Sequence, residues 1–186
     1  SCLRIEMTIN DPKEFKVYKD VHHRDGNTSK RWVPMGKSIS NLYRYAEVSK
    51  AANARFLNSM CNIIPAGSIE KEINGICGKK VMGNRAYTGY NVWSVETFRL
   101  FETISDGKYM IRGFTNREIR RSICIDNPDT ARERGRMSRE LAKLRAHGLI
   151  RRIPHSRRYL VSDKGRRVMG ALIETKRKIY PELAAN

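Results

Sequence analysis

The first third of the chain alternates hydrophobic and polar residues and then repeats hydrophobic residues at helical spacing. Residues 3–10 alternate strictly, which predicts a half-buried strand, and residues 15–18 could pair back on it as a hairpin. After a polar stretch, residues 31–35 are expected to form a short strand that Pro34 confines to an edge. Residues 40–63 carry the longest helical pattern, because hydrophobic side chains recur there at steps of three and four.

Shorter elements follow, around a glycine-rich stretch. Residues 68–77 are expected to form a short helix, and residues 78–91 a loop or linker, because three glycines interrupt any hydrophobic period. Ser94 can cap the next helix, and residues 109–113 are expected to form a short strand. The glycine-rich stretch is therefore the best candidate for a domain boundary.

A capping box marks the start of a helix at Thr115. Its hydroxyl can accept a hydrogen bond from the backbone N–H of Glu118, whose carboxylate can reach back to the cap. The helix that follows carries isoleucines on one side and three arginines that we expect to face outward, namely Arg117, Arg120 and Arg121.

The next helix is expected to cover about residues 131–147, with leucines at helical spacing on its buried side. Gly148 follows where a helix C-cap is expected, since glycine takes the left-handed conformation at no steric cost. Gly135 lies inside this helix and is unfavourable there. It offers an alternative start, which would leave Arg132 and Arg134 outside the helix.

The last part of the chain predicts two strands and a helix. Residues 149–153 and 158–162 carry β-branched and aromatic residues and flank a turn at residues 154–156, which predicts a hairpin. Ser162 or Asp163 can cap a final helix. The hydrophobic stripe of that helix could pack on the body of the protein or on a second copy.

The order helix, short strand, helix, turn, helix, strand, turn, strand is that of the winged helix-turn-helix superfamily, and the stretch LRAHGLIRRIPHSRRYLVSDKG resembles that superfamily closely. The resemblance covers roughly residues 92–162. It implies a recognition helix at about residues 131–147 that enters the major groove, and a wing at about residues 150–162 that lies on the backbone or in the minor groove. The stretch LRIEMTINDPKEFKVY is also similar to uncharacterised prokaryotic proteins that end in a winged helix, and no activity follows from that similarity.

The expected fold class is α+β: a small N-terminal β-hairpin and a long helix, followed by a C-terminal winged helix with an added terminal helix. The expected domains are an α+β module at residues 1–77, a basic glycine-rich linker at residues 78–91, and a winged-helix domain at residues 92–186.

The charge of the chain predicts an anionic partner. The 186 residues include 37 Lys and Arg against 19 Asp and Glu, which gives a formal net charge of +18 and a pI near 10.2. Residues 111–186 hold 20 basic and 8 acidic residues, so two-thirds of the excess lies in the part that resembles a winged helix. Such a field favours a polyanion, and nucleic acid before an anionic membrane.

The resemblance implies which residues would contact DNA. The groove-facing candidates on the third helix are Arg132, Arg134, Arg136, Ser138, Arg139 and Lys143. Arginine can bond guanine bidentately, and serine can bond a base edge or a phosphate. The candidates on the wing are Arg151, Arg152, His155, Arg157 and Arg158.

Five further cations could contact phosphate, or could simply be solvated. They are Arg117 and Arg121 on the second helix of the motif, and Lys79, Lys80 and Arg85 in the glycine-rich stretch. That stretch lacks the Gly-Lys-Ser/Thr ending of a P-loop, so we do not expect a nucleotide site there.

Other chemistry finds little support. The four cysteines are scattered without a close pair, which suits a reducing cytoplasm better than a disulfide framework. His22 and His23 are adjacent and lack the spacing of a metal pair. We expect no metal or other cofactor, and we expect no membrane partner because no hydrophobic run has spanning length.

The simplest function is a cytoplasmic, sequence-reading regulator that binds duplex DNA, with the C-terminal helix as the candidate surface for a homodimer. The chain carries no catalytic motif that leads to a mechanism. One alternative is the nucleic-acid-binding portion of a mobile-element or replication enzyme whose catalytic residues lie outside this sequence. Another is an RNA-binding module, because a basic winged helix can also clamp a duplex by shape.

Overall fold

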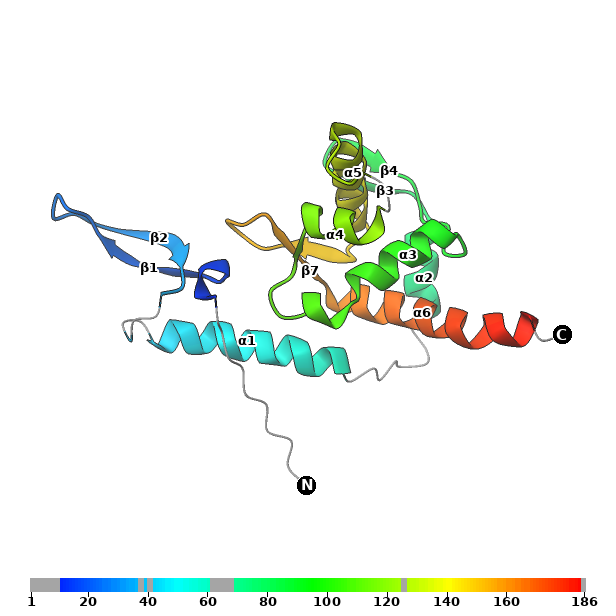
Figure 1. The fold of residues 1–186 in the computed structure, drawn as a ribbon, viewed down its shortest axis with the longest axis horizontal. Coiled ribbons are helices and arrows are strands. Elements are labelled where there is room, and N and C mark those ends of the chain that lie inside the picture. Colours follow the sequence, from blue (N-terminus) through cyan, green and yellow to red (C-terminus); the bar gives the residue numbers. More distant parts are fainter. Residues whose placement is uncertain (1–10, 37–38, 40–41, 61–68, 125–126, 185–186) are drawn as a thin grey trace, which may run out of the picture. The chain divides into compact units, whose positions relative to one another are not determined.

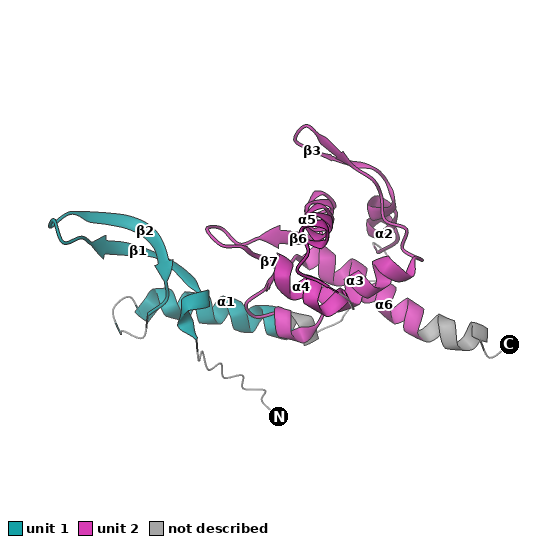
Figure 2. Cartoon of the chain, turned by 45° about the horizontal axis from the view of Figure 1, so that its top comes forward, with its two compact units in different colours: residues 1–60 teal, residues 61–186 magenta. Residues whose placement is uncertain are grey.

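The protein has an α+β fold built from helices and small antiparallel sheets, seen in a computed structural model (Figure 1). The structure describes residues 11–36, 39, 42–60, 69–124 and 127–184, with side chains up to residue 57 in the first long helix and up to residue 177 in the last. The chain divides into two compact units, residues 1–60 and residues 61–186 (Figure 2).

Unit 1 contains a hairpin and a long helix. After a short 3-10 turn, η1 (Pro12–Glu14), strand β1 (Lys16–His22) pairs antiparallel with β2 (Thr28–Pro34), and α1 (Leu42–Met60) follows. The hairpin is longer than the short strand predicted at residues 31–35. The strand predicted at residues 3–10 lies outside the described residues. The small core contains Val17, Met35 and Tyr45.

Unit 2 begins before the predicted boundary. Helix α2 (Ile69–Cys77) belongs to this unit, because Ile76 is fully buried in the unit's core and α2 packs on α6 (Asp163–Ala184). Residues 78–91 are not merely a linker, since they contain a hairpin of β3 (Lys80–Met82) and β4 (Arg85–Tyr87). Its two-residue turn is Gly83-Asn84, a sequence that favours tight hairpin turns and that the glycine-rich interpretation overlooked.

The remaining elements follow the predicted order with one shift. They are α3 (Val95–Ile104), η2 (Gly107–Tyr109), β5 (Phe114–Thr115), α4 (Asn116–Ile123), α5 (Ala131–Ala146), β6 (Ile150–Arg152), β7 (Arg158–Val161) and α6. The strand predicted at residues 109–113 was wrong. The Asp106 carboxylate caps a 3-10 turn there by accepting from the backbone N–H of Lys108, and the strand begins at Phe114.

The helix boundaries confirm the predicted caps. Ser94 caps α3, and Thr115 and Glu118 form the capping box of α4. Helix α5 begins directly after Thr130, so the alternative start at Gly135 was wrong. Gly148 ends α5 with a φ of +72°, in the left-handed region that glycine adopts without strain.

One hydrophobic core holds unit 2 together. Met137, Leu141 and Leu144 on α5 are buried in the same hydrophobic cluster as Phe101 of α3 and Val168 of α6. The three-stranded sheet has the order β5-β7-β6, so β7 lies in the middle, between β6 and the short strand β5 that leads directly into α4. This arrangement positions α5 and the β6–β7 hairpin, which carry most of the predicted site residues.

Candidate nucleic-acid interface

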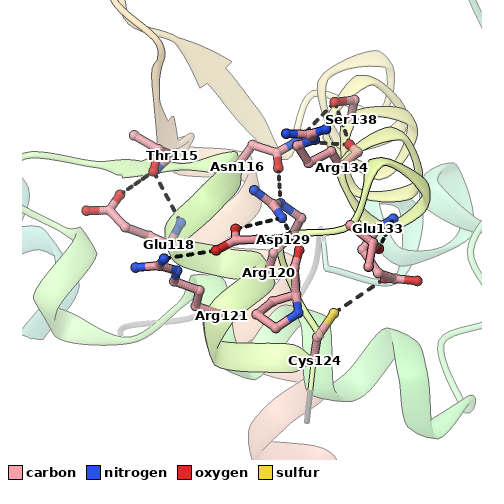
Figure 3. Close-up of polar contacts among 12 residues, drawn as sticks. Thr115, Asn116, Glu118, Arg120, Arg121, Cys124, Asp129, Glu133, Arg134 and Ser138 are labelled. Carbon is pink, nitrogen blue, oxygen red and sulfur yellow. Dashed lines mark hydrogen bonds and ion pairs between the residues drawn. The ribbon is translucent and has the colours of Figure 1, made fainter. Parts of the chain in front are cut away.

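A buried arginine fixes the turn between α4 and α5. The side chain of Arg120 is only 5% exposed, and its Nε donates to the Asn116 side-chain oxygen at 2.7 Å. Its Nη1 donates to the Pro128 carbonyl and to the Asp129 carboxylate, the latter at 3.2 Å (Figure 3). The prediction that Arg120 faces outward was therefore wrong, and Arg120 serves the geometry of the helix pair.

Asn116 extends this network to the middle of α5. Its side-chain amide donates to the Ser138 hydroxyl at 3.0 Å, and that hydroxyl donates to the Arg134 carbonyl at 2.8 Å (Figure 3). Ser138 is exposed, as a base-reading residue would be. However, its hydroxyl proton is already used within the protein, so Ser138 could offer a ligand only its remaining acceptor capacity.

Asp129 joins the turn to a second arginine. Its carboxylate accepts from Arg121 at 2.9 Å, and this hydrogen bond, together with the nearby arginine charges, holds the pKa of Asp129 below its usual value. Arg121 is itself about half exposed, at 52%. Arg121 is thus partly committed to an internal ion pair, whereas Arg117, one turn earlier on α4, is exposed and forms no ion pair with the described residues.

The outer surface of α5 carries exposed cations, several of which form no ion pair with a described residue. Arg132, Arg134 and Arg139 are exposed, and none forms a side-chain ion pair within the described part of the chain. Arg136 is exposed but lies 3.5 Å from Glu133. Lys143 differs from these residues. It is half-buried as a residue, and its ammonium group lies 4.1 Å from the centre of the Tyr90 ring.

The β6–β7 hairpin presents further cations. Arg151, Arg152 and Arg157 are exposed and make no ion pair to any described side chain. Arg152 donates to the Ser156 carbonyl at 3.1 Å, which closes the turn. His155 occupies the turn with a φ of +54° and is also exposed. Its predicted nucleic-acid contact stays a prediction.

Arg158 has a structural role, in contrast to its neighbour Arg157. Its side chain is 13% exposed and donates to the Glu118 carboxylate at 3.3 Å and to the Gly113 carbonyl at 3.2 Å. Burial raises the pKa of Glu118, but hydrogen bonds from Thr115 and the charge of Arg158 outweigh it and lower that pKa overall. Arg158 is therefore engaged within the protein, and its predicted contact with nucleic acid stays a prediction.

The three cations in residues 78–91, which the sequence analysis expected to be a linker, lie on or beside the β3–β4 hairpin. Lys79, Lys80 and Arg85 are exposed and form no ion pair within the described residues. The structure thus gives these residues a defined scaffold, where the sequence suggested only a loop.

A cavity of about 710 Å³ lies beside the first half of α5. Its charged lining balances, with Glu96, Glu133 and Glu140 against Arg99, Arg136 and Lys143. Cys124 also lines it and donates to Glu133 at 3.4 Å. Burial, helped by Glu133, raises the pKa of this thiol, which disfavours the reactive thiolate. No group of metal-ligating side chains occurs among the residues that the structure describes.

Comparisons of the chain with protein-family models, with curated proteins and with solved structures found no match. Within the described ranges, no helix has both the length and the apolar character needed to cross a membrane.

Proposed function

We propose that unit 2 is a winged helix-turn-helix that binds duplex DNA. In this proposal α5 is the recognition helix and the β6–β7 hairpin is the wing. The observation that carries it is the division among the arginines. Arg120 and Arg158 are held in internal contacts that set the geometry, whereas most of the exposed arginines on α5 and on the hairpin form no ion pair with a described residue.

The chemistry of these exposed arginines suits a duplex. Arginine binds phosphate and the guanine edge through a planar set of donors, and a helix fits the major groove in width. Six exposed arginines on α5 and the β6–β7 hairpin form no ion pair with a described residue, namely Arg132, Arg134, Arg139, Arg151, Arg152 and Arg157. If each meets a phosphate, the logarithm of affinity falls with the logarithm of salt concentration with a slope of about −5.

The test is binding of the full chain to labelled duplex DNA, duplex RNA and single strands across a salt series. The wing variant carries Arg151→Ala and Arg157→Ala. The matched control carries Lys71→Ala and Lys108→Ala, which remove the same charge from α2 and η2. Arg158 is left intact, because its truncation would disturb the fold.

We expect preferential binding to duplex DNA, a steep salt dependence, and a slope that becomes shallower by about 2 in the wing variant but not in the control. Equal or tighter binding to duplex RNA, or a salt dependence that is nearly flat, would contradict the proposal. If duplex DNA is preferred, selection of a preferred sequence from random duplexes would support a regulatory role, because a regulator must read base edges as well as the backbone.

A further inference from the structure

The β3–β4 hairpin is closed firmly at its base. The backbone N–H of Tyr90 donates to the Ile76 carbonyl at 2.8 Å, which joins the residue after the hairpin to the end of α2. Gly89 lies against Cys77 so closely that a Cβ there would come within 1.7 Å of the Cys77 carbonyl oxygen. The hairpin therefore projects from a fixed point of unit 2.

The same hairpin is attached to the C-terminal end of α5. His147 is buried, and its Nε2 lies 3.0 Å from the Thr88 carbonyl. Because a carbonyl can only accept, Nε2 carries the proton of that hydrogen bond. The His147 ring packs edge-on against Tyr90 at 5.2 Å, and Lys143 of α5 covers the same tyrosine ring. Strand β3 also packs beside α5.

Two basic hairpins project from different sides of helix α5. Figure 2 shows β3–β4 above α5 and β6–β7 to its left, and strands β3 and β6 each contact α5. Residues 78–91 contain no acidic residue, and their three cations, Lys79, Lys80 and Arg85, are exposed and lack ion pairs to any described residue.

We propose that the β3–β4 hairpin is a second backbone-binding arm, which contacts the phosphates on the side of the duplex away from the wing. This inference rests on the proposed function. A duplex whose major groove receives α5 presents a phosphate strand on each side of that helix, so two flanking basic hairpins match its two strands. The absence of carboxylates from residues 78–91 favours phosphate as the ligand. The arm has no reading role in this proposal, because phosphate contacts position a protein and carry no sequence information.

The experiment compares four forms of the full chain in a salt series and in backbone footprinting on one duplex that the wild type binds. The arm variant is Lys79→Ala, Lys80→Ala and Arg85→Ala. To match its charge, the wing variant used here adds Arg152→Ala to Arg151→Ala and Arg157→Ala. The control is Lys71→Ala, Lys108→Ala and Arg177→Ala, which removes equal charge from α2, η2 and α6. We expect the arm variant to make the salt slope shallower by about 2 to 3 and to lose protection on one flank only, opposite the flank lost in the wing variant.

The outcomes separate the two proposals. If the wild type shows no salt-dependent binding to duplex DNA, the proposed function itself fails. If the wing variant changes the slope and the arm variant does not, only the second arm is overturned. An equal change in the control variant would also overturn it, because net charge alone would then explain the effect.

A further variant tests the attachment with every cation in place. His147→Phe keeps an aromatic ring beside Tyr90 and removes the hydrogen bond to Thr88. If the arm is positioned by His147, this variant loses part of the protection on the arm's flank and keeps the wing's flank. Full protection on both flanks would show that His147 does not position the arm.

Discussion

The guanidinium of Arg158 lies 3.3 Å from the Glu118 carboxylate, which also accepts from the Thr115 backbone N–H at 2.7 Å. One carboxylate thus closes the cap of α4 and holds the middle strand of the sheet. Both side chains are less than one-third exposed, at 13% for Arg158 and 31% for Glu118. This ion pair therefore links the wing to the start of α4, beside the backbone pairing of β5 with β7.

We predict that Arg158→Ala lowers the free energy of unfolding by about 2 kcal/mol, because Glu118 loses a charged hydrogen-bond donor in a partly dry site. Denaturant titration measures the effect. Arg157→Ala is the matched control, and it should change stability by less than about 0.5 kcal/mol because Arg157 is exposed. Equal effects from the two substitutions would contradict the structural role of Arg158.

Arg120→Ala should lower the free energy of unfolding by about 3 kcal/mol, since it leaves the Pro128 carbonyl and the side chain of Asn116 without their buried donor. Arg120→Lys should not restore stability, because an ammonium cannot copy the planar set of donors that reaches three partners. Thermal unfolding of both variants provides the measurement. Recovery of wild-type stability in the lysine variant would argue that charge alone matters at this position.

Gly135→Ala should stabilise the protein by about 0.5 to 1 kcal/mol, because alanine is the better helix former. The new methyl group has space, since its nearest neighbour is the flexible end of Arg139 at 3.5 Å. The comparison is Gly165→Ala on α6, where a Cβ would lie 2.0 Å from the Leu149 carbonyl oxygen. Gly165→Ala should lower the free energy of unfolding. The reverse order of stabilities would contradict the open surroundings of Gly135 and the tight packing of Gly165.

Acid should weaken the fold near neutrality through His147. Burial lowers the pKa of His147 below its ordinary 6.5, so the unfolded chain binds a proton before the folded protein does. The contribution of His147 to the free energy of unfolding is then fully present above pH 6.5. It decreases as the pH is lowered further, by at most about 1.4 kcal/mol per pH unit. Denaturant titrations between pH 7.5 and 5 measure this slope.

The control for the acid effect is His147→Phe, which should flatten that pH dependence whatever its own stability. The carboxylates of Glu118 and Asp129 have pKa values lowered from 4.5 and 3.8, so their contribution is lost only at more acidic pH. An unchanged slope in His147→Phe would assign the effect to other groups.

Local sequence patterns predicted the helices of unit 2 and their caps, because a cap depends on residues three or four apart. The capping box of Thr115 and Glu118 and the stop at Gly148 are of this kind. The β3–β4 hairpin was missed because its strands of three residues are too short for alternation to show. Only the Gly83-Asn84 pair pointed to it.

The roles of individual arginines could not be predicted from local patterns. Arg157 and Arg158 are neighbours with the same side chain, and only the pairing of β7 with β5 turns Arg158 toward Glu118. Arg120 and Arg121 likewise differ only because α5 and its preceding turn cover the former. Burial of a cation depends on tertiary packing, which composition and spacing do not reveal.

The strand order β5-β7-β6 leaves β6 hydrogen-bonded on one side among the described strands. Such an edge offers unpaired backbone groups to a strand from another chain, and exposed charge is a common protection against that association. Arg151 and Arg152 stand on this edge, exposed. Their substitution by neutral residues therefore removes a safeguard against aggregation as well as two cations, and solubility sets a constraint on this strand that is independent of any ligand.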